Sequence, residues 1–325
     1  MSDFLLIFLN WIKLTFNNYS KENLLKFHFN DMNNSFDLFY KDIANSVYGF
    51  DSFINIYYTF LFQKLSRQNF KSEKMFYLSE NQGWEKSLNY NLKYKTKKIY
   101  AVISTPVRYW DTRYLDENNF IFKKNINMYL PDFYAVNGKI SEKNLIKNGY
   151  SKKKIYQVEA LRYKIRKFKN KNKKNFLVAG DYDKKVNLKL EEIIIKLAKI
   201  YKSDLFYIKQ HPNLKFGERL KNIKNCHFIK DKDIYELSNY CGKAIIPNMT
   251  SASIDAVLND LKTVILYTDG QINFSPLKGV KGILHEKDEK MIIKYFKKKE
   301  ENKINKKYFL NLNSNNKLWN KIIKL

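Results

Sequence analysis

The chain has 325 residues, of which 44% are hydrophobic and 28% charged, and this composition excludes a disordered or collagen-like protein. The length favours two domains of roughly 100 to 200 residues each. Its net charge of +28 favours polyanionic partners such as nucleic acid, anionic lipid headgroups or phosphorylated sugars. The two cysteines, Cys226 and Cys241, exclude a disulfide scaffold and lack a metal-ligand spacing, so we expect a reduced, cytoplasmic protein.

The first predicted element is an apolar run from Phe4 to Phe16, which Asn10 and Lys13 interrupt. It has neither the basic start nor the small-residue cleavage site of a secretory signal, and it is shorter than the roughly 20 residues that span a bilayer. We expect a packed helix, with a helix at a membrane interface as the alternative. Aromatic residues without proline continue to about residue 70, so residues 1–70 are predicted to form a helical N-terminal segment.

Short apolar runs then alternate with helical stretches in residues 71–163. The predicted buried strands of this N-terminal acceptor lobe are Lys74–Leu78, Lys98–Ile103 and Phe133–Val136. A Lys-rich run at residues 164–174 follows, and it contains a single aromatic residue. Because stacking positions for bases are missing, we expect a basic linker here; contact with a membrane or an acceptor is the second interpretation and nucleic acid the third.

The same alternation restarts in a C-terminal lobe over residues 175–285, which predicts a second doubly wound α/β domain. Its helices are expected near residues 188–201, 234–240 and 253–258, and residues 286–325 should form a charged helical tail. The expected strands are Asn175–Ala179, Leu205–Lys209, Cys226–Ile229, Ala244–Ile246 and Thr263–Leu266.

Polar loops follow three of these strands, where open α/β sheets bind their ligands. Gly180 allows a ligand or the facing domain to approach the backbone closely, although a glycine after a strand is more often a plain turn. His211, between Lys209 and Pro212, can donate a hydrogen bond to a phosphate. Thr250, Ser251 and Ser253 follow Asn248 at a predicted helix start, which favours either helix capping or anion binding.

These residues resemble the C-terminal half of metal-independent GT-B glycosyltransferases that use CMP-activated acidic sugars, the bacterial sialyltransferases and Kdo transferases. Their His-Pro motif is matched by His211-Pro212, and their Ser/Thr-rich motif by Thr250, Ser251 and Ser253. The resemblance implies that both motifs hold the CMP phosphate. Lys209, Gly180 and Asn248 would line the same donor lobe. Glycerophosphotransferases that use CDP-glycerol carry a similar pair of motifs, so the donor class stays open.

The N-terminal half resembles a bacterial surface-carbohydrate biosynthesis family. The matching segments are Leu78–Glu85, Thr105–Arg113, Val136–Gly138 and Val158–Arg162. The two resemblances cover about residues 35 to 270 and imply an α/β fold with two Rossmann-like lobes of the GT-B kind. Members of this family are longer at the N-terminus, so we expect the N-terminal lobe to lack its first strands.

An inverting transfer needs a base for the acceptor hydroxyl and groups that stabilise the departing phosphate. Glu80, at the end of a predicted strand, is the candidate base, with Asp111 in reserve; helix capping is the competing role of Glu80. Arg108 and Arg113 flank Trp110, a set suited to a sugar carboxylate and a sugar ring, or to structural ion pairs. Lys184 and Lys185 disfavour a divalent ion at the nearby Asp-Tyr-Asp sequence.

The sequence therefore predicts a metal-independent glycosyltransferase without a cofactor. Its expected partners are a nucleotide sugar, which the resemblance implies is CMP-linked, and a glycan or glycolipid acceptor. Contact with the inner face of an anionic membrane is a further expectation, and nucleic acid is not expected. A CDP-glycerol-type glycerophosphotransferase and a noncatalytic carbohydrate-assembly or membrane-surface protein are the alternatives.

Overall fold

A computed structural model describes residues 3–16, 46–108, 110–114, 126–163, 174–298, 304–312 and 315–324. Contacts divide the chain into two units, each described by itself. The first comprises Met1–Ile103, Leu115–Ala135 and Gly149–Tyr156, and the second Ser104–Tyr114, Val136–Asn148 and Gln157–Leu325. The predicted basic linker lies outside the described residues apart from Lys174. The domain bounds expected from the sequence stay predictions.

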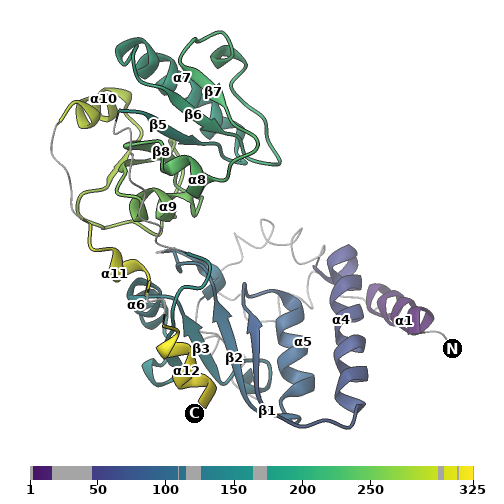
Figure 1. Ribbon diagram of the computed structural model, residues 1–325. Helices are drawn as coiled ribbons and strands as arrows, with labels where there is room; N and C mark the ends of the chain where they lie inside the picture. The colour runs from purple at the N-terminus through teal and green to yellow at the C-terminus, as the bar shows by residue number, and fades with distance from the viewer. Residues whose placement is uncertain are drawn as a thin grey trace, which may run out of the picture. The chain divides into compact units, whose positions relative to one another are not determined.

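The first unit combines helices with a four-stranded sheet in the order β1-β2-β3-β4. Its strands are β1 (Ser72–Leu78), β2 (Thr96–Ile103), β3 (Phe133–Val136) and β4 (Ile155–Gln157), which confirms the three strands expected in this part of the sequence. The helices α4 (Phe50–Arg67) and α5 (Gly83–Leu92) lie side by side, and α1 (Asp3–Phe16) contacts α4 (Figure 1). Strands β1 and β2 are parallel.

Short 3₁₀ turns connect several of these elements. They are η1 (Thr112–Tyr114), η3 (Ile126–Met128), η4 (Lys152–Lys154) and, in the second unit, η5 (Glu218–Leu220). Helix α6 (Lys139–Lys147) follows β3 and belongs to the second unit by its contacts.

The second unit is built on a six-stranded parallel sheet in the order β10-β9-β8-β5-β6-β7. The strands are β5 (Phe176–Ala179), β6 (Phe206–Lys209), β7 (Cys226–Phe228), β8 (Lys243–Pro247), β9 (Lys262–Leu266) and β10 (Leu284–Glu286). The chain moves outward from β5 to β7, then returns to the other side of β5 and continues to β10. The expected doubly wound topology is therefore confirmed, and its switch point lies between β5 and β8.

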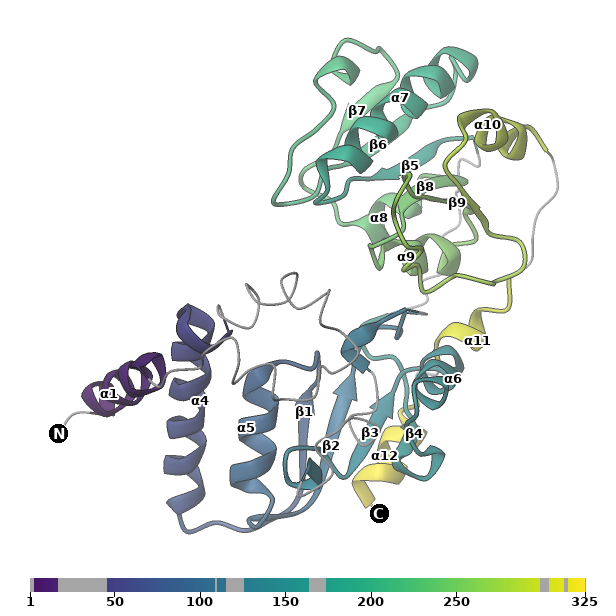
Figure 2. The ribbon, with the colours of Figure 1, turned by 180° about the vertical axis from the view of Figure 1, so that it is seen from behind.

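Both faces of this sheet are covered by helices, because its strands alternate apolar side chains between two buried cores. Phe176 and Val178 point to one core, with α7 (Lys184–Ile200) and α10 (Glu289–Lys297). Leu177 and Ala179 point to the other, with α8 (Ile234–Ser238) and α9 (Ala252–Leu258). Figure 2 shows α7 and α10 on one side of the strands and α8 and α9 on the other.

The C-terminal residues, expected to form a charged tail, contribute to buried cores. Ile292 and Phe296 of α10 are buried in the core of the six-stranded sheet. Helix α11 (Lys306–Phe309) packs on α6, and its Phe309 is 1% exposed. Helix α12 (Lys317–Lys324) begins against Glu159, whose carboxylate accepts hydrogen bonds from the backbone N–H groups of Leu318 and Trp319. These helices are thus parts of the packed second unit.

Candidate functional site

The topological switch point places two loops next to each other at the carboxyl end of the six-stranded sheet. One loop follows β5 and contains Gly180 and Asp181, and the other follows β8 and contains Asn248 to Ser251. The loop after β6, which carries His211, lies on the other side of β5. Ligands of open α/β sheets bind at this kind of edge, so the topology brings together the three loops that the sequence singled out.

The His211 turn is held in place by its own backbone. His211 forms a short antiparallel bridge with Leu214, and its Nδ1 accepts a hydrogen bond from the backbone N–H of Asn213 at 3.2 Å. This bond leaves Nε2 as the ring nitrogen available to a ligand. The ring lies at 6.1 Å from that of Tyr182. Lys209 has turned away, since its Nζ donates to the carbonyl of Lys230 at 2.6 Å, and Pro212 is exposed beside the ring.

Gly180 allows other atoms to come close to its backbone, but these atoms belong to neighbouring residues of the chain itself. A Cβ atom at this position would lie 2.7 Å from the Phe216 ring and 3.0 Å from the His211 backbone nitrogen. The backbone N–H of Gly180 donates to Lys209 at 2.8 Å. Gly180 therefore fixes the packing of the β5 and β6 loops. The interpretation in which a ligand uses this space is not supported by the geometry.

In the Ser/Thr-rich loop after β8, two hydroxyl groups form hydrogen bonds within the loop and one remains available to a ligand. Ser253 is fully buried and its hydroxyl donates to the carbonyl of Thr250, so it cannot meet a ligand, contrary to the expectation from sequence. The Thr250 hydroxyl accepts a hydrogen bond from the Ala252 backbone at 3.2 Å, which is a capping role. Ser251 is partly exposed at the start of α9 and makes no side-chain capping bond. It is the hydroxyl best placed for an anion.

Asn248 lies behind this loop as part of a polar network. Its side chain is 2% exposed, and its amide nitrogen lies 3.4 Å from the side-chain oxygen of Gln271. Gln271 also donates to Asp183, which caps α7 through the Lys185 backbone. The Asn248 Oδ1 atom is buried without a hydrogen-bond partner. Asn248 therefore connects the loops that follow β5, β8 and β9 and has no direct access to a ligand.

Asp181 is a buried carboxylate in the same region that the sequence analysis did not assign. It is 2% exposed and accepts a hydrogen bond from the Asp183 backbone at 2.9 Å. Burial raises the pKa of Asp181 above its ordinary value, and the negative charge of Asp183 acts in the same direction, while His211 opposes it. A buried acid with a raised pKa beside a histidine is typical of functional sites. The Asp-Tyr-Asp sequence was the signal for it.

A second cluster lies in the loop formed by residues 104–114, which we call the Arg108 loop. Asp111 is 4% exposed and receives two hydrogen bonds from Arg113, each 2.9 Å long. Arg108 adds a third at 3.3 Å. Desolvation raises the pKa of Asp111, but the bonds and charges of Arg113 and Arg108 outweigh it and leave the pKa below its ordinary value. This geometry does not support Asp111 as the reserve base and favours the ion-pair interpretation.

The Arg108 loop touches the loop after β8 on one side and a cavity on the other. Arg108 Nη1 lies 3.4 Å from the carbonyl oxygen of Met249. The half-exposed ring of Trp110 lies under two ammonium groups, that of Lys278 at 4.8 Å and that of Lys147 at 5.5 Å. Lys278 lines the cavity, so a chain of contacts connects the Met249 backbone, Arg108, Trp110 and the cavity wall.

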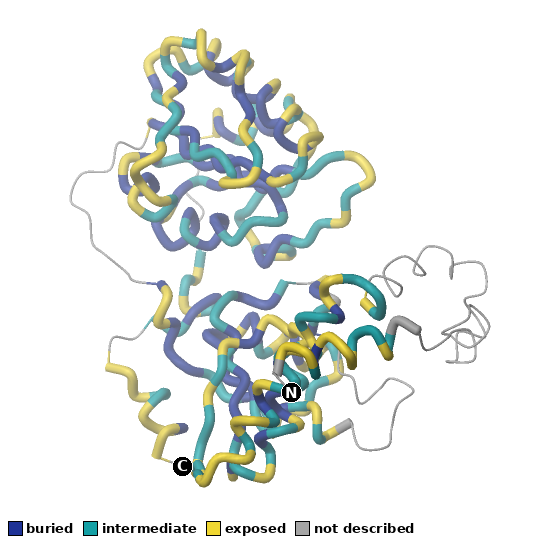
Figure 3. Tube along the Cα trace, turned by 90° about the vertical axis from the view of Figure 1, so that its right-hand side faces the viewer, coloured by how far each residue is buried: buried dark blue, intermediate teal, exposed yellow. Residues whose placement is uncertain are grey.

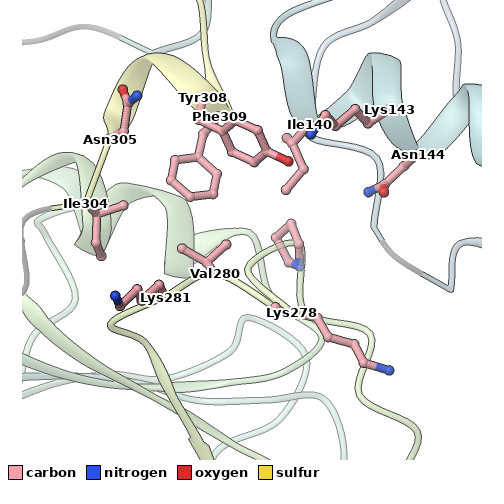
Figure 4. A pocket seen from close by; sticks show the side chains of 12 residues that line it. Ile140, Lys143, Asn144, Lys278, Val280, Lys281, Ile304, Asn305, Tyr308 and Phe309 are labelled. Atoms are coloured by element: carbon pink, nitrogen blue, oxygen red, sulfur yellow. The ribbon is translucent and has the colours of Figure 1, made fainter.

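This cavity, the lysine cavity, has a volume of about 390 Å³. Side chains from α6, from the loop after β9 and from α11 surround it (Figure 4). Its described lining has three lysines and no acidic side chain, and consists of Ile140, Lys143, Asn144, Pro276, Lys278, Gly279, Val280, Lys281, Ile304, Asn305, Tyr308 and Phe309. Neither His211 nor Ser251 lines it. The cavity and the predicted phosphate loops are thus separate places, linked by the Arg108 loop.

Glu80, the candidate base, lies in the first unit and is exposed at the end of β1. The buried carboxylate here belongs to Glu85, which is 4% exposed. Glu85 accepts hydrogen bonds from the Ser79 hydroxyl and from the backbone N–H groups of Glu80 and Gln82, at 2.7 to 2.9 Å. Glu85 therefore organises the loop before α5, and the role of Glu80 as the base stays a prediction.

Within the described ranges, no group of three or more His, Cys, Asp or Glu side chains is placed to hold a metal ion. The prediction of a metal-independent protein is not tested by this observation. No helix in the described part of the chain has both the length and the apolar character needed to cross a membrane.

No protein-family model and no curated protein sequence matches the chain. Solved structures do match it. The Neisseria meningitidis UDP-GlcNAc 2-epimerase bound to UDP-GlcNAc aligns over 85% of this chain and 82% of its own, with 14% identity and a TM-score of 0.56. The S. aureus MnaA–UDP co-structure aligns over 83% and 77%, with 12% identity and a TM-score of 0.53. A GtfA/B complex aligns over 82% and 59%, with 13% identity and a TM-score of 0.52.

These similarities establish the fold, a GT-B-like α/β architecture with parallel sheets, as the sequence predicted. They also correct the expected function. Two of these three solved structures are named for UDP or UDP-GlcNAc, and none of the three names mentions a CMP-sugar. The expectation that the chain transfers a sialic-acid-like or Kdo-like sugar from a CMP-activated donor is therefore wrong. The His-Pro and Ser/Thr motifs are too short to distinguish donors.

Proposed function

We propose that the chain is an enzyme that acts on a UDP-linked sugar, with the diphosphate bound at the carboxyl ends of β5, β6 and β8. The observation that carries this proposal is the position of His211 and Ser251 in the loops after β6 and β8, the two strands that flank β5. Neighbouring strands lie about 4.8 Å apart, so two strand spacings put these loops about 10 Å apart. Two linked phosphates span such a distance more readily than a single phosphate does.

Each proposed contact has a chemical reason. The Ser251 hydroxyl would bind one phosphate, because it lies at the start of α9 and makes no capping hydrogen bond of its own. The free Nε2 of His211 would bind the other phosphate. Arg108, held near the start of α9 by the Met249 carbonyl, would add a fixed cation. The UDP and UDP-GlcNAc complexes among the structures of this fold support uridine as the nucleoside.

The sugar or a second substrate would lie toward the lysine cavity. Trp110 is half-exposed and tryptophan rings stack on sugar rings, while the three lysines of the cavity complement a negatively charged group. A glycan or glycolipid acceptor and contact with an anionic membrane remain part of the proposal. Their support is the net charge of +28.

Calorimetric titration with UDP, UDP-GlcNAc, CMP and CDP tests the proposed donor. We expect UDP to bind at least about tenfold more tightly than CMP, a difference of roughly 1.4 kcal/mol. His211→Ala and Ser251→Ala should each weaken UDP binding about tenfold or more. The matched control is His227→Ala, a change of the same residue type at an exposed position on β7. No UDP binding by the folded protein, or equal binding by the His211 variant, would contradict the proposal.

Two reaction types are then distinguishable with UDP-GlcNAc in D₂O. Inversion at C2 breaks the C2–H bond and forms a new one with a solvent-derived proton, so deuterium appears at C2 and UDP stays attached. Transfer breaks the bond between C1 and the diphosphate, so UDP is released only when an acceptor is added. Mass spectrometry and NMR of the nucleotide sugar separate these outcomes. If the protein binds UDP but forms neither product, it is a binding protein, and the proposed enzymatic activity is refuted.

A further inference from the structure

Helices α1 and α4 of the first unit expose an unusual amount of apolar surface. On α1, Phe4 is 67% exposed and Leu9 is 45% exposed, and on α4 Phe50 is 73% exposed. Most surface helices turn polar side chains to water, and contiguous exposed apolar patches mark a binding partner or a lipid surface. The exposed positions near the N-terminus are yellow in Figure 3. This surface is unrelated to the proposed nucleotide site.

The exposed residues of α4 form one continuous stripe. Phe50, Tyr57, Leu61 and Leu65 are each more than 40% exposed, and their spacing, with Ile54 between the first two, repeats every three or four residues. At 100° per residue these side chains share one face of the helix. Phe62, on a different face, is buried in a small core with Leu88 and Leu92 of α5. The stripe is therefore an outward face and no part of the helix packing.

Helix α1 extends this stripe through aromatic contacts. The rings of Phe4 and Trp11 both meet Phe53 of α4 edge-on, at 6.3 and 6.0 Å, and Phe50 stacks on Phe53 at 6.1 Å. Phe4 also stacks on Phe8. We call the joined surface the apolar patch, and its exposed members are Phe4, Leu5, Phe8, Leu9, Phe50, Tyr57, Leu61 and Leu65.

The charged side chains beside the apolar patch indicate which kind of partner it binds. Lys13 lies in the last turn of α1, and Lys64 and Arg67 lie in the last turn of α4, so these basic side chains outnumber the single acidic one, Asp51, in the first turn of α4. Lys64 sits three residues after Leu61 and next to Leu65, at the border of the stripe. Basic side chains beside aromatic and leucine side chains are the chemistry of helices that lie in the interface of an anionic bilayer. Helix α1 has 14 residues, too few to cross a bilayer.

We propose that the apolar patch on α1 and α4 docks the protein onto an anionic lipid surface. The aromatic and leucine side chains insert among the headgroups and upper acyl chains, and the lysine and arginine side chains contact lipid phosphates. A second copy of the chain is the competing occupant of the patch. The charge pattern favours lipid, because two identical basic patches repel each other.

Flotation of the full chain with vesicles tests the proposal. The vesicles are pure phosphatidylcholine, or phosphatidylcholine with 30% phosphatidylglycerol. We expect at least about tenfold stronger binding to the anionic vesicles. The triple variant Phe8→Gln, Phe50→Gln and Leu61→Gln should lose at least about tenfold in affinity, since each substitution removes an apolar side chain from the bilayer. Lys64→Gln should lose roughly fivefold at low salt.

The matched control removes three exposed apolar side chains elsewhere. Leu188, Ile272 and Ile323 are each 47 to 57% exposed in the second unit, and their triple Gln variant should bind vesicles like the natural protein. All substituted positions are exposed, so unfolding temperature and UDP titration should stay unchanged in every variant. A change confined to lipid binding separates this inference from the proposed nucleotide function.

Three results would overturn the proposal. One is the absence of binding to anionic vesicles. Another is equal binding by the patch variant and the control variant, which would mean that the general positive charge suffices. The last is a dimer of the natural protein that the patch variant converts to a monomer without any lipid binding, which would identify the patch as a self-association surface.

Discussion

At the scale of single residues, the polar groups near the site are occupied by partners on the chain itself. Asp111 faces two arginines, the Ser253 hydroxyl bonds to Thr250, and the Nδ1 atom of His211 is taken by a backbone N–H group. The type of a residue at a strand end therefore did not predict whether its side chain is available to a ligand. The groups that remain available to a ligand are the Ser251 hydroxyl and the Nε2 atom of His211, which take no part in these internal hydrogen bonds.

Asp111→Asn is expected to reduce stability. The neutral amide leaves Arg108 and Arg113 without their shared carboxylate at a position whose side chain is only 3% exposed, and breaking a buried pair costs about 3 to 5 kcal/mol. Partial exposure of Arg113 lowers our expectation to about 2 to 3 kcal/mol. Urea unfolding at pH 7 measures it. A catalytic base would instead give an unchanged free energy of unfolding together with lost turnover.

Asp255 should make stability depend on pH. Burial raises its pKa to about 6 from 3.8, with Asp233 acting in the same direction and Arg162 opposing. The folded state therefore holds a proton that the unfolded state releases, and the free energy of unfolding falls as pH rises from about 4 to 6. Asp255→Asn removes this loss and should stabilise the protein by about 1 to 3 kcal/mol at pH 7.5, with little effect at pH 4.

Urea unfolding at both pH values tests the Asp255 prediction. The control is Asp231→Asn, an exposed carboxyl on the preceding loop, which should change stability by less than about 0.5 kcal/mol at either pH. Equal effects of Asp255→Asn at pH 4 and 7.5 would exclude titration as the cause.

At the scale of elements, buried side chains decide where loops and helices begin. The Glu85 carboxylate accepts hydrogen bonds from three donors in the turn between β1 and α5. The Glu159 carboxylate accepts hydrogen bonds from the first N–H groups of α12. Both are single carboxylates that receive several hydrogen bonds in a buried place. Removing either one leaves unsatisfied donors, which cost more than the bonds themselves contribute.

Glu85→Ala should cost about 2 to 4 kcal/mol of folding free energy, because the Ser79 hydroxyl and two backbone N–H groups lose their acceptor. Glu80→Ala, five residues earlier and exposed, should cost less than about 0.5 kcal/mol. Thermal unfolding of both variants measures the contrast. If Glu80→Ala destabilises as much as Glu85→Ala, the assignment of the buried carboxylate is incorrect.

The sequence predicted the strands well and the site partly. The runs of apolar residues in β1, β2, β5 and β8 have the length and composition of buried strands, so their type could be recognised locally. The burial of Ser253 and the ion pairs of Asp111 depend on side chains that meet only after folding, and no local pattern encodes them. The group that approaches Gly180 is Phe216 of the same unit, 36 residues away, whereas the sequence had suggested a ligand or the facing domain. The donor nucleotide depended on motifs of two to four residues, which carry too little information.

At the scale of the whole molecule, the second unit is assembled from distant parts of the chain. Its core includes Ile140 of α6 together with Phe309 and Leu310 of the C-terminal residues. The backbone N–H of Asn311 bonds to Asn137, and Ala160 bonds back to Asn311, at 2.8 and 2.9 Å. Gly138 permits this contact, since a Cβ atom there would lie 1.9 Å from the carbonyl oxygen of Phe309.

Gly138→Ala should displace α11 and destabilise the second unit by about 3 kcal/mol or more, because the atom it meets belongs to the backbone and cannot rotate away. Limited proteolysis should then cut within residues 304–312 faster than in the natural protein. Gly279→Ala is the control. Its Cβ would meet nothing within 4 Å, so only its φ of +79° costs stability, about 1 kcal/mol. Equal protease sensitivity of both variants would argue against the close contact.

The contact between Glu159 and the start of α12 also sets an order of events during translation. Glu159 leaves the ribosome well before Leu318 and Trp319, whose backbone N–H groups its carboxylate will accept. At a synthesis rate of about 5 to 20 residues per second, the intervening stretch takes about 8 to 30 s to appear. During this interval Ile140 lacks the cover that Phe309 and Leu310 provide in the finished core, and the Glu159 carboxylate lacks the two backbone donors of α12.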